Sequence, residues 1–159
     1  MNAFLIRVDD LLGPEIQAFL RDHLTNMHEI TPPESVHALD VEGLRAPGMT
    51  FWSAWAGARL LGCGALREID ARTGEIKSMR TDPARRGRGV GTRMLQHLLG
   101  VAEARGYERV LLETGALPEF EPARSLYRRH GFEERGPFPP YREDPNSVFM
   151  EKRLGRSFE

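Results

Sequence analysis

The distribution of apolar and polar residues along the chain predicts alternating strands and helices. In four stretches, apolar positions recur at the spacing of one helix face. Shorter runs rich in branched and aromatic residues are typical of strands. We therefore expect helices over residues 11–27, 31–44, 90–105 and 121–131. We expect strands over residues 3–8, 50–55, 60–66, 75–81, 109–114 and 147–154.

The order of these elements indicates a mixed sheet in a single α/β or α+β domain. A chain of 159 residues is short enough for one core, and no repeat or linker interrupts it. The helix at 90–105 is a crossover connection of the kind that joins two parallel strands. We expect one domain over residues 1–154 and a frayed tail over residues 155–159.

The composition of the chain limits the cellular environment and the kinds of binding partner that we expect for the protein. The formal net charge is -1, so the chain as a whole has no attraction to nucleic acids or anionic membranes. No apolar run is long enough to span a bilayer, and the first residues lack a signal-peptide core. Cys63 is the single cysteine, which excludes an intrachain disulfide. These features predict a soluble, cytoplasmic protein.

The stretch RRGRGVG, residues 85–91, is the strongest candidate for a binding site. It follows the strand that Asp82 and Pro83 end, and it precedes the helix that starts near Gly89. Glycines there let an anion reach the unpaired N–H groups at the helix start, and the arginines add local positive charge. The spacing matches neither a dinucleotide-binding fingerprint nor a P-loop. It predicts a cradle for a pyrophosphate, with a tight turn and solvated arginines as the structural alternative.

Two sequence motifs narrow this prediction. MRTDPARRGRGVGTRMLQHLL resembles the acyl-CoA motif of the GNAT family of N-acetyltransferases, with Arg86, Gly89 and Gly91 at its fixed positions. ARSLYRRHGFEE resembles a second motif of that family, matched at Ala123, Leu126, Tyr127, Gly131 and Phe132. The resemblance extends over residues 50–154, whereas the N-terminal third agrees in layout only.

The resemblance implies a fold and a co-substrate. The expected fold is a mixed, mostly antiparallel sheet of six to seven strands, flanked by about four helices and splayed between its two central parallel strands. Acetyl-CoA would bind in that split, and a bulge near Met79 would direct an N–H group at the thioester oxygen. The implied contacts to acetyl-CoA come from Met79, Arg80, Thr81, Arg86, Gly87, Arg88, Gly89, Val90, Gly91, Thr92 and Tyr127.

The resemblance also implies acetylation of an amine, which requires a base and an acid. Tyr127 matches the tyrosine that the family often uses to protonate the leaving thiolate, although a packing role is the alternative. Glu75 is the first candidate for the base, and Glu113 on the neighbouring strand is the second. Strict alternation would place Glu75, Lys77, Met79 and Thr81 on one face of their strand. The alternative for Glu75 is a solvated carboxylate at the end of a strand, and the alternative for Glu113 is a structural hydrogen-bond acceptor at a buried edge.

The acceptor side is less well determined. Ser35, His37 and Tyr141 are candidate substrate contacts. His23 and its neighbouring histidines lack a recognised metal-ligand spacing, so we expect no metal. We expect these histidines to line the substrate pocket or to face solvent. Phe120 stands where the family often has asparagine, which puts one coenzyme contact in doubt.

The expected acceptor is a primary amine of a small molecule or peptide, with no nucleic-acid or membrane partner, and homodimerisation is possible. The alternatives are a non-catalytic acyl-CoA sensor and an arginine-mediated nucleic-acid binder.

Overall fold

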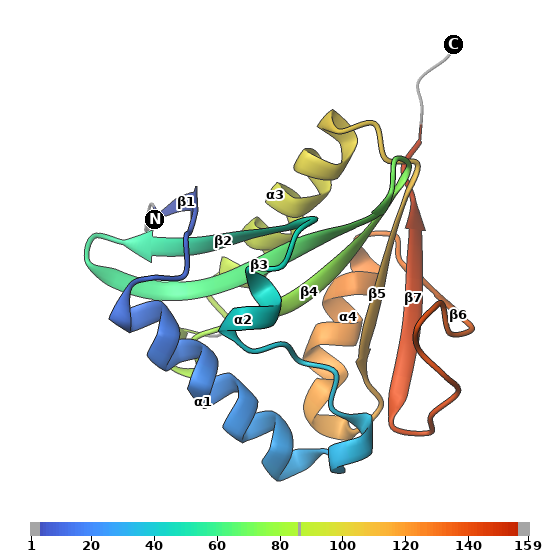
Figure 1. Ribbon diagram of the computed structural model, residues 1–159, viewed down its shortest axis with the longest axis horizontal. Coiled ribbons are helices and arrows are strands. Elements are labelled where there is room, and N and C mark those ends of the chain that lie inside the picture. Colours follow the sequence, from blue (N-terminus) through green and yellow to red (C-terminus); the bar gives the residue numbers. More distant parts are fainter. Residues whose placement is uncertain (1–3, 86, 156–159) are drawn as a thin grey trace.

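The computed structural model describes residues 4–85 and 87–155. Within them the chain forms a seven-stranded sheet in the order β1-β2-β3-β4-β5-β7-β6 (Figure 1). Only β4 and β5 are parallel, and every other pair of neighbours in this sheet is antiparallel. The strands are β1 Leu5–Val8, β2 Met49–Ala56, β3 Arg59–Asp70, β4 Thr73–Thr81, β5 Arg109–Gly115, β6 Glu133–Arg135 and β7 Ser147–Arg153.

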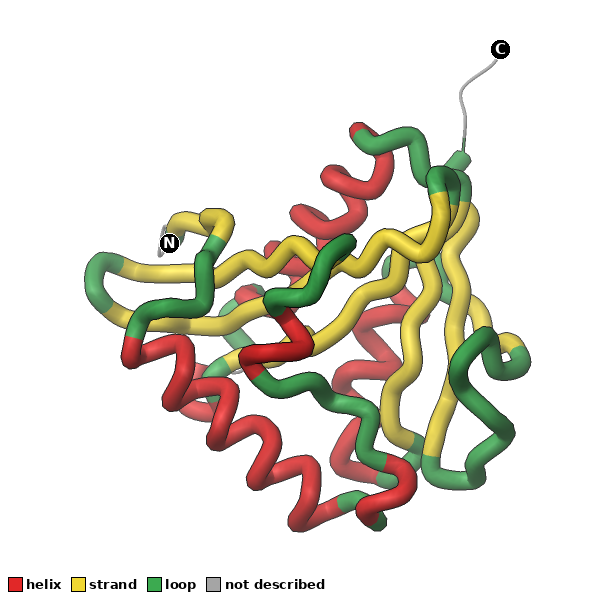
Figure 2. The backbone as a smooth tube through the Cα atoms, in the orientation of Figure 1, coloured by secondary structure: helices red, strands yellow, loops and turns green. Residues whose placement is uncertain are grey.

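Helices cover both faces of the sheet (Figures 1 and 2). They are α1 Pro14–Ile30, α2 Val41–Leu44, α3 Val90–Ala104 and α4 Glu121–Arg129. One apolar cluster joins α3 and α4 to the sheet, and a second joins α1 and α2 to the opposite face. This arrangement confirms the predicted mixed, mostly antiparallel fold.

The crossover helix α3 begins and ends as the sequence predicts. Gly89 precedes it with φ +82, and Gly106 follows it with φ +82. A side chain rarely adopts this left-handed conformation, which explains glycine at both ends. Met94, Leu95 and Leu98 lie on its buried face, as their helical spacing requires.

The single helix expected over residues 31–44 does not form. The chain makes a short 3-10 turn at Pro33–Ser35, runs extended, and then forms the one-turn helix α2. Asp40 explains the interruption, because it is extended and its side chain accepts a 2.9 Å hydrogen bond from the N–H of Gly43. A residue in that conformation starts a new helix and cannot continue an old one.

The parallel strands β4 and β5 pair only along their first halves. The ladder joins Thr73–Ile76 to Arg109–Leu112 and stops there, so the two strands diverge beyond it (Figure 1). The predicted split between the central strands is therefore present. Its open end lies toward α1 and α4.

A bulge on β4 accompanies the split and corrects the predicted alternation. Ser78 has φ +54, and the β3–β4 register shifts between Cys63 and Ala65. As a result Lys77 faces the α1 side, where Tyr141 lies, whereas Met79 packs against the α3 and α4 cluster. Glu75 and Lys77 share a face, but Met79 and Thr81 do not lie on it.

The central core predicts a large difference between two leucine substitutions. Leu98→Ala should lower the free energy of unfolding by about 2–5 kcal/mol, because this fully buried side chain would leave a cavity under the sheet. Leu12→Ala is the matched control, since Leu12 is 59% exposed and should change stability by less than about 0.5 kcal/mol. Urea denaturation measures both, and equal losses would contradict this account of the core.

Candidate active site

A pocket opens where β4 and β5 separate. Its wall combines the inner face of α1, the segment that follows it, the diverging ends of β4 and β5, and α4. The lining residues are His23, Met27, His37, Ala38, Glu75, Ile76, Lys77, Ser78, Met79, Glu113, Thr114, Gly115, Phe120, Ala123 and Tyr127. The structure thus brings together Glu75, Glu113, Tyr127, Met79 and His37, five of the residues singled out in the sequence.

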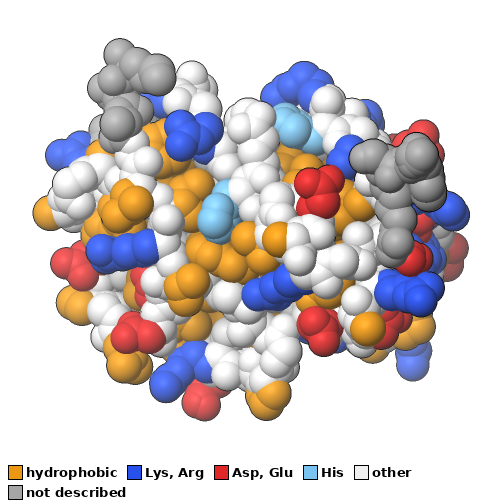
Figure 3. Space-filling view, turned by 90° about the horizontal axis from the view of Figure 1, so that it is seen from above, with side chains coloured by type: hydrophobic (Ala, Val, Ile, Leu, Met, Phe, Trp, Pro, Cys, Tyr) orange, Lys and Arg blue, Asp and Glu red, His pale blue; other side chains and the backbone are white. Residues whose placement is uncertain are grey.

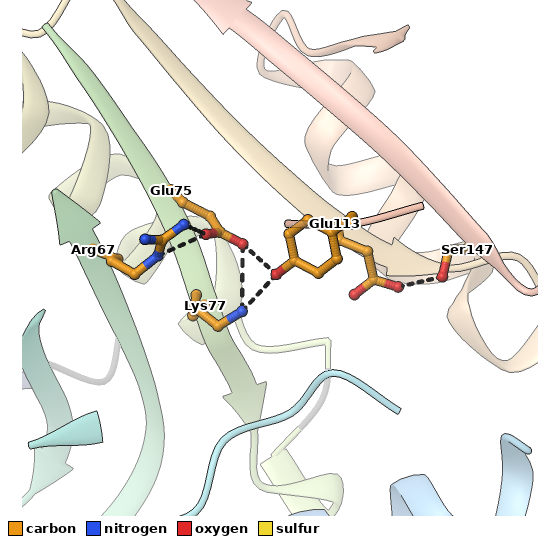
Figure 4. A network of polar contacts seen from close by, with 6 residues as sticks. Arg67, Glu75, Lys77, Glu113 and Ser147 are labelled. Carbon is orange, nitrogen blue, oxygen red and sulfur yellow. Dashed lines mark hydrogen bonds and ion pairs between the residues drawn. The ribbon is translucent and has the colours of Figure 1, made fainter. Parts of the chain in front are cut away.

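Glu75 is buried at the base of a polar network (Figure 4). Arg67 donates to its Oε1 from Nε at 2.9 Å and from a terminal nitrogen at 2.8 Å. Lys77 Nζ lies 3.3 Å from Oε2, and Tyr141 donates its hydroxyl to the same oxygen at 2.5 Å. Both oxygens of Glu75 are therefore already engaged, which makes Glu75 the centre of the network.

Tyr141 connects this network to the α1 side of the pocket. Its hydroxyl accepts a 2.6 Å hydrogen bond from Lys77 while it donates to Glu75. Burial, followed by the negative charge of Glu75, raises the pKa of Tyr141, so the phenol stays protonated and remains a donor. The His37 ring packs edge-on against the Tyr141 ring, with centroids 5.0 Å apart. Tyr141, expected to contact substrate, thus supports two residues that line the pocket.

Glu113 lies on β5, at the first position beyond the part of this strand that pairs with β4. Ser147 donates to its Oε2 at 2.8 Å (Figure 4). Burial raises the pKa of Glu113 to about 7, even though the Ser147 hydrogen bond and the charge of Lys77 act in the opposite direction. Glu113 can therefore take up and release a proton near neutral pH, which is the property of a general base or acid.

Tyr127 lies across the same split, on α4. Its ring is buried and packs edge-on against Phe132 at 5.7 Å between centroids. Burial, followed by the charge of Glu113, raises the pKa of Tyr127. The phenol is therefore neutral at physiological pH and can act as a proton donor.

His23 lines the pocket, which is one of the two positions that the sequence left open for it. Its Nδ1 lies 3.0 Å from a terminal nitrogen of Arg80. A guanidinium only donates, so Nδ1 accepts and the proton of the neutral ring lies on Nε2. Burial, followed by the charge of Arg80, lowers the pKa of His23 to about 4. The spacing of Ile16, Leu20 and His23 along one buried face of α1 is the sequence feature that favours the pocket over solvent for His23.

Ser35 does not line the pocket. Its hydroxyl donates to Asp144 Oδ2 at 2.6 Å, and the Asn146 side chain approaches it at 3.4 Å. Ser35 thereby fastens the segment after α1 to the loop before β7. Phe120 does line the pocket, and its ring lies directly over Gly115, where a β-carbon would collide with it.

The N-terminus of α3 lies at the end of β4. Gly87 and Gly89 both have positive φ, and added β-carbons there would meet nothing within 4 Å. Among the residues that the structure describes, no side chain caps this helix start, and the first turn of α3 carries no acidic residue. A β-carbon at Gly91 would lie 3.5 Å from Thr81 Oγ1, so the helix start and the strand end adjoin.

The first N–H groups of an α-helix have no partner within the helix, so the amides of Val90, Gly91 and Thr92 are the donors that the sequence predicts for this turn. Arg88 is exposed beside it. Arg86, also predicted to contact the coenzyme, lies outside the described residues.

Charges elsewhere on the surface are mixed. On the face drawn in Figure 3, basic side chains alternate with acidic, apolar and other polar ones. Over residues 4–85 and 87–155, no three His, Cys, Asp or Glu side chains are arranged to hold a metal ion. In the same part of the chain, no helix is both long enough and apolar enough to cross a membrane.

Comparison with known proteins decides the family. The sequence profile of the acetyltransferase (GNAT) family matches residues 15–132. The chain belongs to the GNAT family of acetyltransferases. It is 54% identical to the uncharacterised N-acetyltransferase YsnE of Bacillus subtilis, over 94% of this chain and 99% of that protein. It is 47% identical to the uncharacterised N-acetyltransferase YedL of Escherichia coli, over 95% of each chain. The protein is accordingly an N-acetyltransferase.

Solved structures of GNAT proteins share the fold. A Klebsiella pneumoniae protein assigned to the acyl-CoA N-acyltransferases superposes with a TM-score of 0.79 and 29% identity, over 98% of this chain and 100% of that one. An aminoglycoside 6′-N-acetyltransferase in complex with coenzyme A superposes with a TM-score of 0.70 and 19% identity, over 97% and 99% of the two chains. The second likeness is one of fold alone.

The raised pKa of Glu113 predicts how one GNAT variant changes stability with pH. The pKa of Glu113 is about 7 in the folded protein, against an ordinary value of 4.5 for a glutamate, so the folded state resists ionisation. Stability is therefore lost as pH rises from about 4.5 to about 7, and the loss persists above that range. Glu113→Gln removes the ionisation. It should stabilise the protein more at pH 8 than at pH 4, as measured by urea denaturation.

Ser147→Ala is the companion variant, because its hydroxyl favours the ionised form of Glu113. This substitution should raise the Glu113 pKa further, which carboxyl-carbon NMR titration would detect. A stability gain in Glu113→Gln that is the same at pH 4 and pH 8 would contradict the elevated pKa.

Proposed function

We propose that this protein transfers the acetyl group of acetyl-CoA to a primary amine of a small molecule or peptide, by direct attack in a ternary complex. One observation carries the proposal. The start of α3 adjoins the end of β4, and Glu113 and Tyr127 both line the pocket that opens where β4 and β5 separate. A binding surface for a pyrophosphate thus leads into a pocket that contains proton-transfer groups.

The coenzyme would lie along the freed edge of β4. The amide groups of residues 87–92 and the charge of Arg88 suit its pyrophosphate, and Arg86 belongs to the same proposal. Among the described residues the β4–β5 ladder ends at Ile76 and Leu112, so the edge of β4 at Met79 and Thr81 borders the split, where the pantetheine amides can pair with it as an added strand would. The likeness to an acetyltransferase fold solved with coenzyme A supports this placement.

The base in this proposal is Glu113, whereas Glu75 keeps the network together. Arg67, Lys77 and Tyr141 occupy both oxygens of Glu75, which leaves no free lone pair directed at an acceptor amine. Glu113 has one hydrogen-bond donor among the described residues, Ser147, and a pKa of about 7. A base with that pKa can deprotonate an ammonium group at physiological pH and release the proton afterwards.

Acetyl-CoA supplies an activated acetyl group, whose C–S bond is exchanged for a C–N bond to the amine. Glu113 takes the proton that the amine gives up. Tyr127 donates its hydroxyl proton to the sulfur that leaves, and regains a proton from solvent. The N–H of Met79, displaced by the bulge at Ser78, would stabilise the charge that develops on the carbonyl oxygen.

The cradle at the start of α3 predicts the effect of a charge reversal. Gly89→Glu should weaken acetyl-CoA binding about tenfold or more, because a carboxylate there competes for the amides and repels the pyrophosphate. Isothermal titration calorimetry measures the affinity. Gly100→Glu, at an exposed position near the other end of the same helix, is the matched control and should bind normally.

Gly89→Ala separates backbone strain from charge, since it imposes a side chain at φ +82 without a carboxylate. Its affinity should lie close to that of the unsubstituted protein. If Gly89→Glu and Gly100→Glu bind acetyl-CoA equally well, the cradle is not the pyrophosphate site.

The assignment of base and acid predicts two kinetic changes. Glu113→Gln should lower kcat by about 10²–10⁴-fold and abolish the limb of the pH profile near pH 7, with the affinity for acetyl-CoA retained. Tyr127→Phe should also lower kcat more than acetyl-CoA affinity. Steady-state kinetics across pH, together with calorimetry, separates these effects. A Glu113→Gln enzyme that keeps its pH profile would exclude Glu113 as the base.

A further inference from the structure

We propose that the acceptor is an amine that also carries a carboxylate, as an amino acid does, and that Lys77 binds this carboxylate. The inference rests on the proposed function and specifies its substrate. It follows from the balance of charge around the pocket and from the hydrogen-bond donors that its α1 side presents.

The network at the base of the pocket has one positive charge in excess. Arg67 and Lys77 converge on a single carboxylate, Glu75. All three are substantially removed from solvent, with side-chain exposures of 31% for Arg67, 11% for Lys77 and 1% for Glu75. A buried excess charge is costly until an opposite charge accompanies it. The excess is therefore a feature that an anionic ligand group would satisfy.

Neighbouring anions do not remove this excess. Glu113 is close to half protonated at neutral pH, because its pKa is about 7. Asp144 accepts hydrogen bonds from the Ser35 hydroxyl and from the backbone N–H of Asn146, so both of its oxygens are engaged outside the Glu75 network. Among the described residues, Lys77 therefore forms an ion pair with Glu75 alone, and Arg67 is paired with the same carboxylate.

The ammonium group of Lys77 has one more N–H donor than it has acceptors among the described residues. An ammonium group has three N–H bonds, and Glu75 and Tyr141 are the two acceptors it contacts among the described residues. Because the Tyr141 hydroxyl donates to Glu75, it accepts from Lys77, so these two bonds are fixed. Lys77 lines the pocket, where its third N–H is available to a bound molecule.

The histidines beside the pocket add donors without adding charge. Arg80 fixes His23 as the neutral ring with its proton on Nε2, and this edge is the one left for a ligand. His37 has its pKa lowered by burial and by the charge of Lys77. Lys77 and His23 thus present N–H groups suited to carboxylate oxygens.

The same charges disfavour purely cationic acceptors. A polyamine or a simple alkylamine would bring positive charge to the pocket with nothing to offset Lys77. An amino acid brings an amine for Glu113 and a carboxylate for Lys77. Met27, Ala38 and Phe120 supply apolar surface in the same pocket, which favours an apolar side chain on the acceptor.

Matched acceptors test this inference directly. The panel consists of L-methionine, L-leucine and L-phenylalanine, the carboxamide of each, and the decarboxylated amine of each. We expect kcat/KM for at least one amino acid to exceed that of its carboxamide and its amine by about tenfold or more. Acetyl-CoA binding is measured separately by thermal unfolding.

Lys77→Met identifies the group responsible. It should lower the ratio of kcat/KM for the amino acid to that for its carboxamide by about ten- to a hundredfold. The ratio within one variant cancels any general loss of folding or chemistry. Lys152→Met, on β7, is the matched control and should leave the ratio unchanged.

The outcomes separate this inference from the proposed function. A protein that neither binds acetyl-CoA nor acetylates any acceptor would overturn the proposed function itself. A protein that binds acetyl-CoA but prefers the carboxamides or amines, or acetylates none of the amino acids, would overturn only the carboxylate inference. An unchanged ratio in Lys77→Met would remove Lys77 from it.

Discussion

The failure of β4 and β5 to pair along their full length is the constraint on which the site depends. Backbone groups that leave a ladder must find other partners, and here they lie at the edge of a pocket. The bulge at Ser78 is part of the same feature, because it turns Lys77 and Met79 to opposite sides of the sheet. A continuous sheet would have had neither the cavity nor free amides.

The glycine-rich turn is built from residues that are neighbours in the sequence, whereas the pocket at the split is built from residues that lie far apart in it. The turn is encoded in consecutive residues, because Gly87 and Gly89 adopt positive φ and the helix follows at once. This explains why the turn and the start of α3 could be predicted from the sequence. The proposed acceptor side joins α1, β4 and the loop before β7. One of its contacts, between Lys77 and Tyr141, links residues that are 64 positions apart. No local pattern encodes such contacts.

The differences between the predicted and observed structures have the same origin. The expected single helix over residues 31–44 failed because Asp40 caps a separate turn of its own. Alternation placed Met79 beside Glu75 because a period of two cannot register a single inserted residue. Glu75 was favoured as the base on its position alone, whereas its three partners are visible only when the chain is folded. His23 was expected to line the substrate pocket or face solvent, and its helical spacing beside Ile16 and Leu20 favours the pocket, where it lies.

The bond between Ser35 and Asp144 spans 109 positions in sequence. The segment after α1 forms only the short 3-10 turn at Pro33–Ser35 and the one-turn helix α2, so few backbone hydrogen bonds of regular elements hold it. Segments of this kind open by local unfolding more readily than a sheet or a long helix does. In such a protein the coenzyme surface would be rigid and the acceptor surface adaptable, an asymmetry that lets related chains change their substrates without altering the fold.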